Sequence, residues 1–212
     1  MKEIFHRHRS LWVQKSFLVG VIMGILMLVA GISATYYANF YTTIHASNSV
    51  TDIILDNIPT INVDFVFSEG ASIFVAIFIA VILYEPKRMP FALKAAAMFF
   101  VTRSFFMILT HIAPPTHGSY VDPTDLIYKL SSGDDLFFSA HTGFPFLLAL
   151  TFWDERYLRA LFLVATAIGG AAVLLGHLHY SIDVFSALFI SFGVYYAAKN
   201  FFSSDYALLK SQ

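Results

Sequence analysis

Long apolar runs, almost free of charge, constrain the fold of this chain more than any other feature of its sequence. Five runs of roughly 20 residues are clear: Phe17 to about Phe40, Phe65–Tyr84, Phe91–Ile112, Leu158 to about Leu178, and Ile182–Phe202. A helix of this length spans a bilayer and satisfies its own backbone polar groups there. The sequence therefore predicts an all-α polytopic membrane protein.

A sixth, shorter apolar run extends from about Phe137 to Trp153 and is interrupted by His141 and Pro145. A helix tolerates proline best in its first turn, so we expect a helix here as well. The fold expected from the sequence is therefore a bundle of six transmembrane helices.

The composition agrees with a membrane protein and excludes several classes of function. The chain is 58% hydrophobic and only 13% charged, which is too little charge to cover a soluble domain of this length. Its formal net charge of -1 provides no basic surface for nucleic acid. Cysteine is absent, so disulfides, thiolate nucleophiles and cysteine-ligated metal sites are excluded.

Basic residues gather on one expected side of the membrane. That side holds Lys2, Arg7, Arg9, Lys15, Lys87, Arg88, Arg156, Arg159, Lys199 and Lys210, whereas Lys129 is the only Lys or Arg in the acidic loops opposite. Lys and Arg are enriched in cytoplasmic loops, so both termini should be cytoplasmic. We expect residues 1–16 to form a cytoplasmic or interfacial segment, 17–202 a transmembrane catalytic domain and 203–212 a cytoplasmic tail.

His179 and Asp183 lie four residues apart, near the outer end of the last expected helix. Residues at this spacing are neighbours on one helix face. The carboxylate can then bind one imidazole nitrogen and leave the other as a nucleophile or base. The two side chains could instead serve only to stabilise a helix end. Because ionisable groups inside a membrane are costly and usually functional, we favour catalysis.

A second polar cluster, at residues 133–142, lies where an outer loop enters the short expected helix. His141 is near the beginning of that helix, where free backbone N–H groups and the helix dipole attract phosphate. Ser139 would either contact the phosphate or cap the helix. The topology brings this cluster and the His179–Asp183 pair to the same outer face.

Arg103 is the third candidate, because an arginine within a membrane helix requires an anion. A substrate phosphate would serve, and the structural alternatives are Glu69, Asp135 and Asp183. Ile112 lies nine residues further on, roughly 13 Å at the helical rise, so the phosphate would enter a recessed chamber.

These motifs resemble the sphingomyelin synthase family, a branch of the phosphatidic acid phosphatase type 2 superfamily. The family's Gly-Asp and Ser-Gly-His-Thr resemble Asp134-Asp135 and Ser139-Ala140-His141-Thr142, its His-Tyr-Thr-(aliphatic)-Asp-Val resembles residues 179–184, and its Arg-then-Thr-Leu-Pro segment resembles Arg103 to Pro114. Asp134 and Ala140 replace family glycines. The resemblance covers about Phe91 to Phe202 and implies six helices with an outward-facing site.

By this resemblance the catalytic triad is His141, His179 and Asp183, and we expect Arg103, Ser139 and Asp135 to contact the substrate phosphate. The phosphatases of the wider superfamily carry a further Lys-then-Arg-Pro motif, which is missing here. They also have an arginine six residues before the second histidine, a position that Val173 occupies in this chain.

The sequence thus favours a histidine phosphotransferase that acts on lipid phosphoesters, without metal or other cofactor. His179 would attack the phosphorus, Asp183 would orient the His179 ring and stabilise its imidazolium, and His141 would protonate the leaving oxygen. Water or a lipid alcohol would resolve the phosphohistidine, completing phospholipase C-type cleavage or head-group transfer. Alternatives are a lipid phosphate phosphatase, a hydrolase with zinc ligated by His177 and the triad, and a transporter using Arg103 and Glu69.

Overall fold

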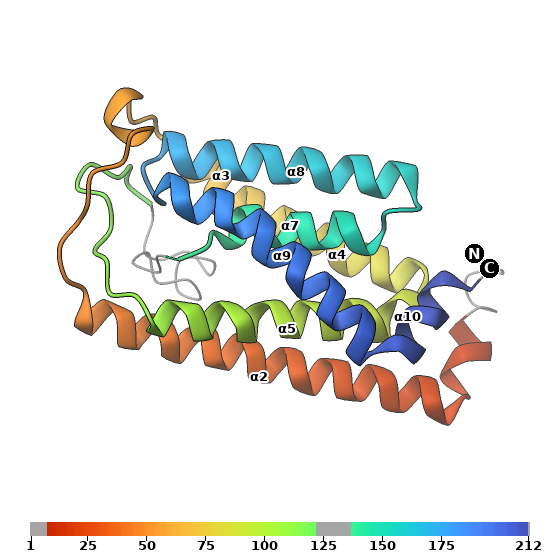
Figure 1. Cartoon of the computed structure of the whole chain (residues 1–212). Coiled ribbons are helices and arrows are strands. Elements are labelled where there is room, and N and C mark those ends of the chain that lie inside the picture. Colours follow the sequence, from red (N-terminus) through yellow and green to blue (C-terminus); the bar gives the residue numbers. More distant parts are fainter. Residues whose placement is uncertain (1–7, 122–136, 212) are drawn as a thin grey trace.

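The computed structural model describes residues 8–121 and 137–211, and Figure 1 shows these parts of the chain as a bundle of helices. Residues 8–12 are helical. The longer helices are α2 (Lys15–His45), α4 (Glu69–Tyr84), α5 (Met89–Ile108), α7 (Ala140–Thr151), α8 (Arg156–Leu175) and α9 (Ser181–Phe201). Four short helices accompany them: η1 (Leu55–Asn57), α3 (Asp64–Phe67), η2 (Pro86–Arg88) and α10 (Ser203–Lys210).

Five helical stretches among the described residues are long and apolar enough to cross a membrane. They are Lys15–His45, Asp64–Tyr84, Pro86–Ile108, Arg156–Leu175 and Ser181–Phe201. Their outward faces are apolar, since Leu26, Val29, Ile73 and Phe189 are each more than half exposed. Five of the six expected spans are therefore present, at close to the expected positions.

Helix α7 does not qualify as the sixth span. It has 12 residues and so extends roughly 18 Å, well short of the roughly 30 Å hydrocarbon core. Pro145 is the sixth residue of α7, beyond the first turn where the sequence argument placed it. Because proline has no N–H, the His141 carbonyl loses its partner within the helix. Gly169 of α8 accommodates this carbonyl, since a Cβ there would lie 2.2 Å from the oxygen.

Helices α2 and α5 lie side by side along their lengths (Figure 1). Glycines of α2 permit this approach, and a Cβ on Gly24 would lie only 2.9 Å from Leu93 Cβ. Further along, the Thr35 and Ser104 hydroxyl oxygens are 3.0 Å apart. Small residues and interhelical hydrogen bonds are the usual basis of helix association in membranes. This packing holds α5, and with it Arg103, against α2.

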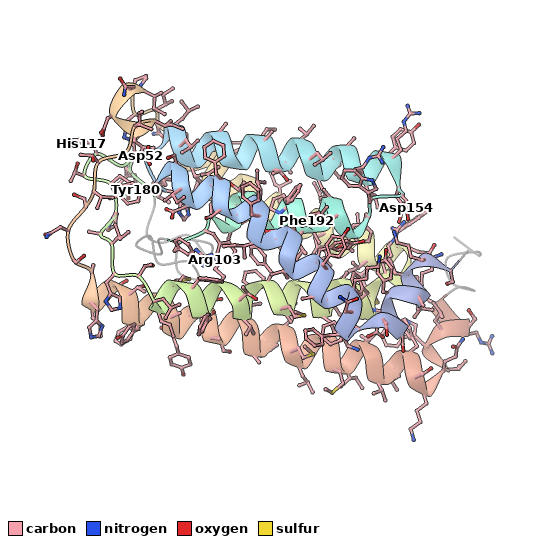
Figure 2. All side chains as sticks on the ribbon, viewed as in Figure 1. Asp52, Arg103, His117, Asp154, Tyr180 and Phe192 are labelled. Carbon is pink, nitrogen blue, oxygen red and sulfur yellow. The ribbon has the colours of Figure 1, made fainter. Side chains whose placement is uncertain are left out.

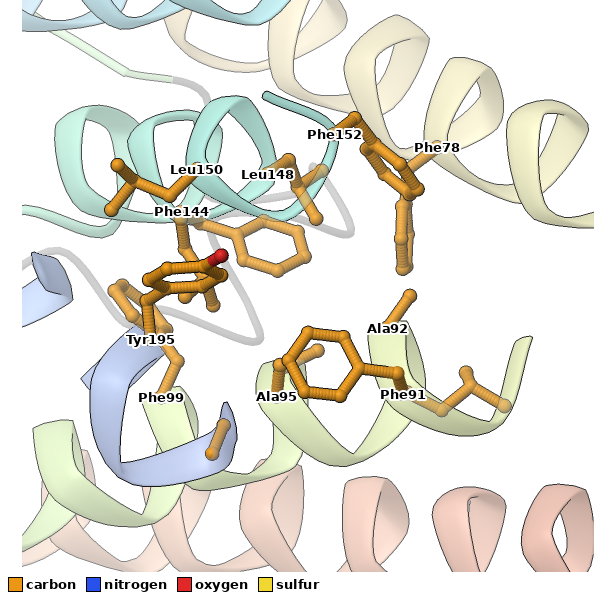
Figure 3. Close-up of a cluster of buried hydrophobic side chains, with 14 of the residues drawn as sticks. Phe78, Phe91, Ala92, Ala95, Phe99, Phe144, Leu148, Leu150, Phe152 and Tyr195 are labelled. Atoms are coloured by element: carbon orange, nitrogen blue, oxygen red, sulfur yellow. The ribbon is translucent and has the colours of Figure 1, made fainter. Parts of the chain in front are cut away.

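Aromatic side chains fill the centre of the bundle between α4, α5 and α7 (Figure 3). The Phe99 ring lies 5.7 Å from Phe144 and 5.4 Å, edge-on, from Phe138. Such contacts add to the stabilisation that burial of aromatic area provides. The segment that leads into α7 is thus anchored in the core through Phe138.

The two ends of the bundle differ in character. Figure 1 shows the beginning of α2 and the end of α10 at one end of the bundle, which we call the end of the termini. Three ion pairs lie there: Arg88 with Glu155, Lys94 with Asp205, and Lys210 with Asp154. At the opposite end, backbone hydrogen bonds join the loops 46–63 and 109–121 to each other and to residues 175 and 176, where α8 ends. The candidate site lies at this second end, which we call the loop end.

Candidate active site

His179 and Asp183 are in contact, but the contact arises from a helix cap. His179 precedes α9, in the turn after α8, and Asp183 lies in the first turn of α9. Asp183 Oδ2 accepts the Tyr180 backbone N–H at 3.0 Å and lies 3.4 Å from His179 Nδ1. Both residues are at most 3% exposed. The expected pair is therefore present, although the expected helix face does not produce it.

A tight turn before α7 joins the second cluster to this pair. Phe137 and Phe138 have φ of 106° and 24°, values that residues with side chains rarely adopt. Beyond the turn, the Ser139 N–H donates to the Asp183 carbonyl at 3.0 Å. Arg103 Nε donates to the Phe138 carbonyl at 3.1 Å. Hydrogen bonds to the backbone of residues 138 and 139 thus join three segments that are far apart in the sequence.

The ring of His141 packs against Phe67 of α3. The two rings stack with centroids 4.1 Å apart, and His141 Nε2 lies 3.2 Å from the Phe67 carbonyl oxygen. A carbonyl oxygen only accepts, so we assign the proton of this bond to Nε2, and Nδ1 is left for chemistry. His179 and Arg103 are near enough to His141 to interact with it electrostatically.

Arg103 is only 2% exposed, and its Nη1 also contacts Met107 Sδ at 3.2 Å. Figure 2 shows it in the same half of the bundle as Tyr180, far from Asp154. The helix ends at Ile108, so Arg103 lies five residues, or roughly 8 Å, from that end. Arg103 therefore lies closer to the end of its helix than the roughly 13 Å expected when the helix was taken to extend to Ile112.

Two hydroxyl groups beside His141 have no hydrogen-bond partner in residues 8–121 and 137–211. They belong to Ser139 and Thr142, which are buried at 0% and 2% exposure. Ser139 occupies the N-cap position of α7, yet its hydroxyl makes no capping bond. Buried polar groups normally find partners, because an unsatisfied one costs stability. An unpartnered hydroxyl at a helix N-terminus is suited to an anionic ligand.

The structure places five of the six expected site residues at the loop end, and Asp135 lies outside the described residues. Within the described ranges, no three His, Cys, Asp or Glu side chains converge as metal ligands would. Phe67 was not expected at the site, since its contact with His141 depends on the break between α3 and α4. Two other residues were not expected there either: Asp52, which accepts the Ser181 N–H from a distant loop, and Tyr180, whose hydroxyl accepts the Val50 N–H.

Part of the chain matches a known protein family. Residues 133–200 match the family model described as PAP2 superfamily C-terminal, where PAP2 denotes phosphatidic acid phosphatase type 2. The matched segment contains α7, α8 and all but the last residue of α9, and therefore both histidines and Asp183. No curated protein matches the chain. This similarity supports the phosphatidic acid phosphatase type 2 superfamily, and with it a membrane enzyme of the lipid phosphatase or phosphoesterase type.

Proposed function

We propose that the protein is a metal-independent histidine phosphotransferase that cleaves or transfers the phosphorylated head groups of membrane lipids. The observation that carries the proposal is the backbone bond from Ser139 to Asp183, since it brings the motifs of His141 and His179 together. Around them lie a buried arginine and the unpartnered hydroxyl of Ser139. A nucleophile, a proton donor and anion-binding groups are the parts that phosphoryl transfer requires.

In the first step, His179 Nε2 attacks phosphorus and the bond from phosphorus to the leaving oxygen breaks. Asp183 stabilises the positive charge that forms on the imidazole. Its 3.4 Å contact with His179 is long, and such contacts often shorten when substrate is bound. Protonated His141 donates a proton to the leaving oxygen from Nδ1, because Phe67 holds Nε2.

In the second step, neutral His141 accepts a proton from the acceptor, which is water or a lipid alcohol. The acceptor oxygen attacks the phosphohistidine, the bond from phosphorus to nitrogen breaks, and His179 is regenerated. Arg103 and the N–H groups at the beginning of α7 stabilise the phosphoryl oxygens in both steps. The residues are the same for hydrolysis and transfer, and only the acceptor differs.

The surroundings of Val173 favour a phosphodiester over a phosphomonoester. Val173 is fully buried, and it packs with Phe67, Val121 and Val184 where the superfamily's phosphatases have an arginine. A phosphomonoester carries more negative charge than a diester and requires more positive groups around it. Lipid phosphate phosphatase activity is the second candidate, since the family match supports phosphatases and phosphoesterases alike.

The proposal is tested with purified protein and a panel of phospholipids and lipid phosphates, with and without diacylglycerol or ceramide. Mass spectrometry of the lipids identifies the products. We expect His179→Ala to reduce turnover by at least about a thousandfold, and His141→Ala by about 10²–10⁴-fold. His117→Ala is the control, because His117 is an exposed histidine at the same end. Persistent turnover in His179→Ala would exclude His179 as the nucleophile.

A further inference from the structure

Asp52 is a buried acid at the loop end that has no part in the chemistry described above. It lies in the loop between α2 and α3 and is 9% exposed. Its Oδ2 accepts the Ser181 backbone N–H at 2.7 Å. Ser181 is the first residue of α9, where N–H groups have no partner within the helix. A carboxylate from a distant loop therefore caps the helix that follows His179.

The same carboxylate is fixed within its own loop. Oδ1 accepts the N–H groups of Ile54 at 2.8 Å and Leu55 at 3.2 Å. Burial disfavours the charge, but the hydrogen bonds from Ser181, Ile54 and Leu55 outweigh it and lower the pKa of Asp52. Asp52 is therefore ionised at neutral pH, and a negative charge at the positive end of the α9 dipole is stabilising.

Tyr180 ties the turn to both outer loops. Its hydroxyl accepts the Val50 N–H at 3.1 Å and donates to the Ala113 carbonyl at 2.9 Å. Burial raises the pKa of Tyr180, so the hydroxyl keeps the proton that it donates. Figure 2 shows Asp52 beside Tyr180 at the loop end. The loop 46–63 thus contacts two adjacent residues, Tyr180 and Ser181. The loop 109–121 contacts Tyr180 as well.

One oxygen atom, Asp183 Oδ2, connects these contacts to His179. Tyr180 directly follows His179, and its N–H binds Asp183 Oδ2, the atom that also contacts His179 Nδ1. Any displacement of the turn at residues 180 and 181 therefore changes how Asp183 meets His179. The loop of Asp52 continues into α3, where Phe67 stacks on His141. One stretch of chain thus supports both histidines.

We propose that Asp52 is a positioning residue, which fixes His179 relative to His141 by capping α9. This inference rests on the proposed function for its effect on turnover. A displacement of about 1 Å at a reacting group can reduce a rate about a hundredfold. We therefore expect Asp52→Ala to reduce kcat about 10–100-fold and to leave KM within about twofold.

Two further variants separate positioning from loss of structure. Asp52→Asn keeps one accepting oxygen, but its NH2 group then faces either the Ser181 N–H or the N–H groups of Ile54 and Leu55, so it should lose kcat about as Asp52→Ala does. Ser181→Pro removes that N–H at the first helical position, which suits proline. Tyr180 has φ −70° and ψ 157°, a conformation compatible with a following proline. Ser181→Pro should therefore fold and lose kcat as Asp52→Ala does. Asn48→Ala, which changes an exposed side chain in the loop of Asp52, is the control.

The second measurement does not depend on activity. The protein is labelled with ¹⁵N-histidine, and the ring signals of His179 are assigned by their absence in His179→Ala. We expect these signals to shift in Asp52→Ala and Ser181→Pro, but not in Asn48→Ala. Unchanged signals in both of the first two variants would overturn the inference, even if kcat fell. If wild-type protein turned over no lipid, the proposed function would fail, and the signals would still decide the role of Asp52.

Discussion

At Ser139 the side chain that we expect to favour activity is one that costs the protein stability. Its side chain is fully buried at the N-cap of α7, and its hydroxyl has no partner in the described part of the chain. A serine that caps a helix stabilises a protein by about 1 kcal/mol, which Ser139 does not gain here. The unsatisfied hydroxyl instead costs stability until a ligand binds it. A phosphate oxygen is the partner that the proposed chemistry supplies.

We expect Ser139→Ala to reduce kcat/KM by about 10–100-fold, because a hydrogen bond to a charged phosphate contributes about 1.5–3 kcal/mol. The melting temperature should stay the same or rise, since no bond within the protein is lost. Ser104→Ala provides the contrast: its hydroxyl bonds the Phe100 carbonyl at 2.7 Å, so this variant should lose stability instead. A lower melting temperature with unchanged kcat/KM in Ser139→Ala would show that Ser139 acts as a cap.

At the scale of elements, the crossing of α7 and α8 fixes the position of His141. Pro145 leaves the His141 carbonyl without a partner in its own helix, and Gly169 leaves room for that carbonyl against α8. Gly193 of α9 has nothing within 4 Å of the place where a Cβ would lie. The two glycines are both helical and differ only in what faces them. They therefore form a matched pair for substitution.

We expect Gly169→Ala to lower the free energy of unfolding by about 1–3 kcal/mol, because the added methyl group meets backbone that cannot rotate away. Turnover should fall with it, since α7 carries His141. Gly193→Ala should leave turnover unchanged and raise stability by up to about 1 kcal/mol, through helix propensity. Thermal unfolding in detergent and turnover of the same samples check both. Equal stability of the two variants would contradict tight packing at Gly169.

The elements also show how far the sequence alone could lead. Apolar runs predicted the five long spans, because length and hydropathy are properties of each segment by itself. They did not predict the break at Ser68 between α3 and α4, or the beginning of α7 at Ala140 instead of Phe137. Both differences serve contacts between distant segments: Phe67 with His141, and Ser139 with Asp183. Such contacts leave no periodic signal in one sequence.

The site shows the same division between local and distant information. His179, Asp183 and His141 could be chosen from the sequence, since ionisable groups are rare in membrane segments and their local motifs are recognisable. Which nitrogen of His141 is free for chemistry could not be predicted from the sequence, because the other nitrogen is bound by the Phe67 carbonyl of another helix. The sequence alone does not distinguish Asp52 from the other acidic residues of its loop. Its hydrogen bond to Ser181 exists only in the folded chain.

At the scale of the whole molecule, the two ends of the bundle differ in their content of Lys and Arg. Lys87, Arg88 and Lys210 lie at the end of the termini, whereas the proposed site and Asp52 lie at the loop end. Positively charged residues near the ends of membrane helices are enriched on the cytoplasmic side. We therefore propose that the site faces away from the cytoplasm. Lipid head groups of the outer or luminal leaflet would then be its substrates.

This orientation can be measured with single cysteines, because the natural chain has none that would add background labelling. Asn48 is exposed in the loop after α2, and Ser204 is exposed in α10 at the opposite end. We expect a membrane-impermeant maleimide to label Asn48→Cys in intact cells, and to label Ser204→Cys only after the membrane is permeabilised. The reverse pattern would place the site on the cytoplasmic side. Both variants should retain wild-type turnover, because neither side chain contacts the site.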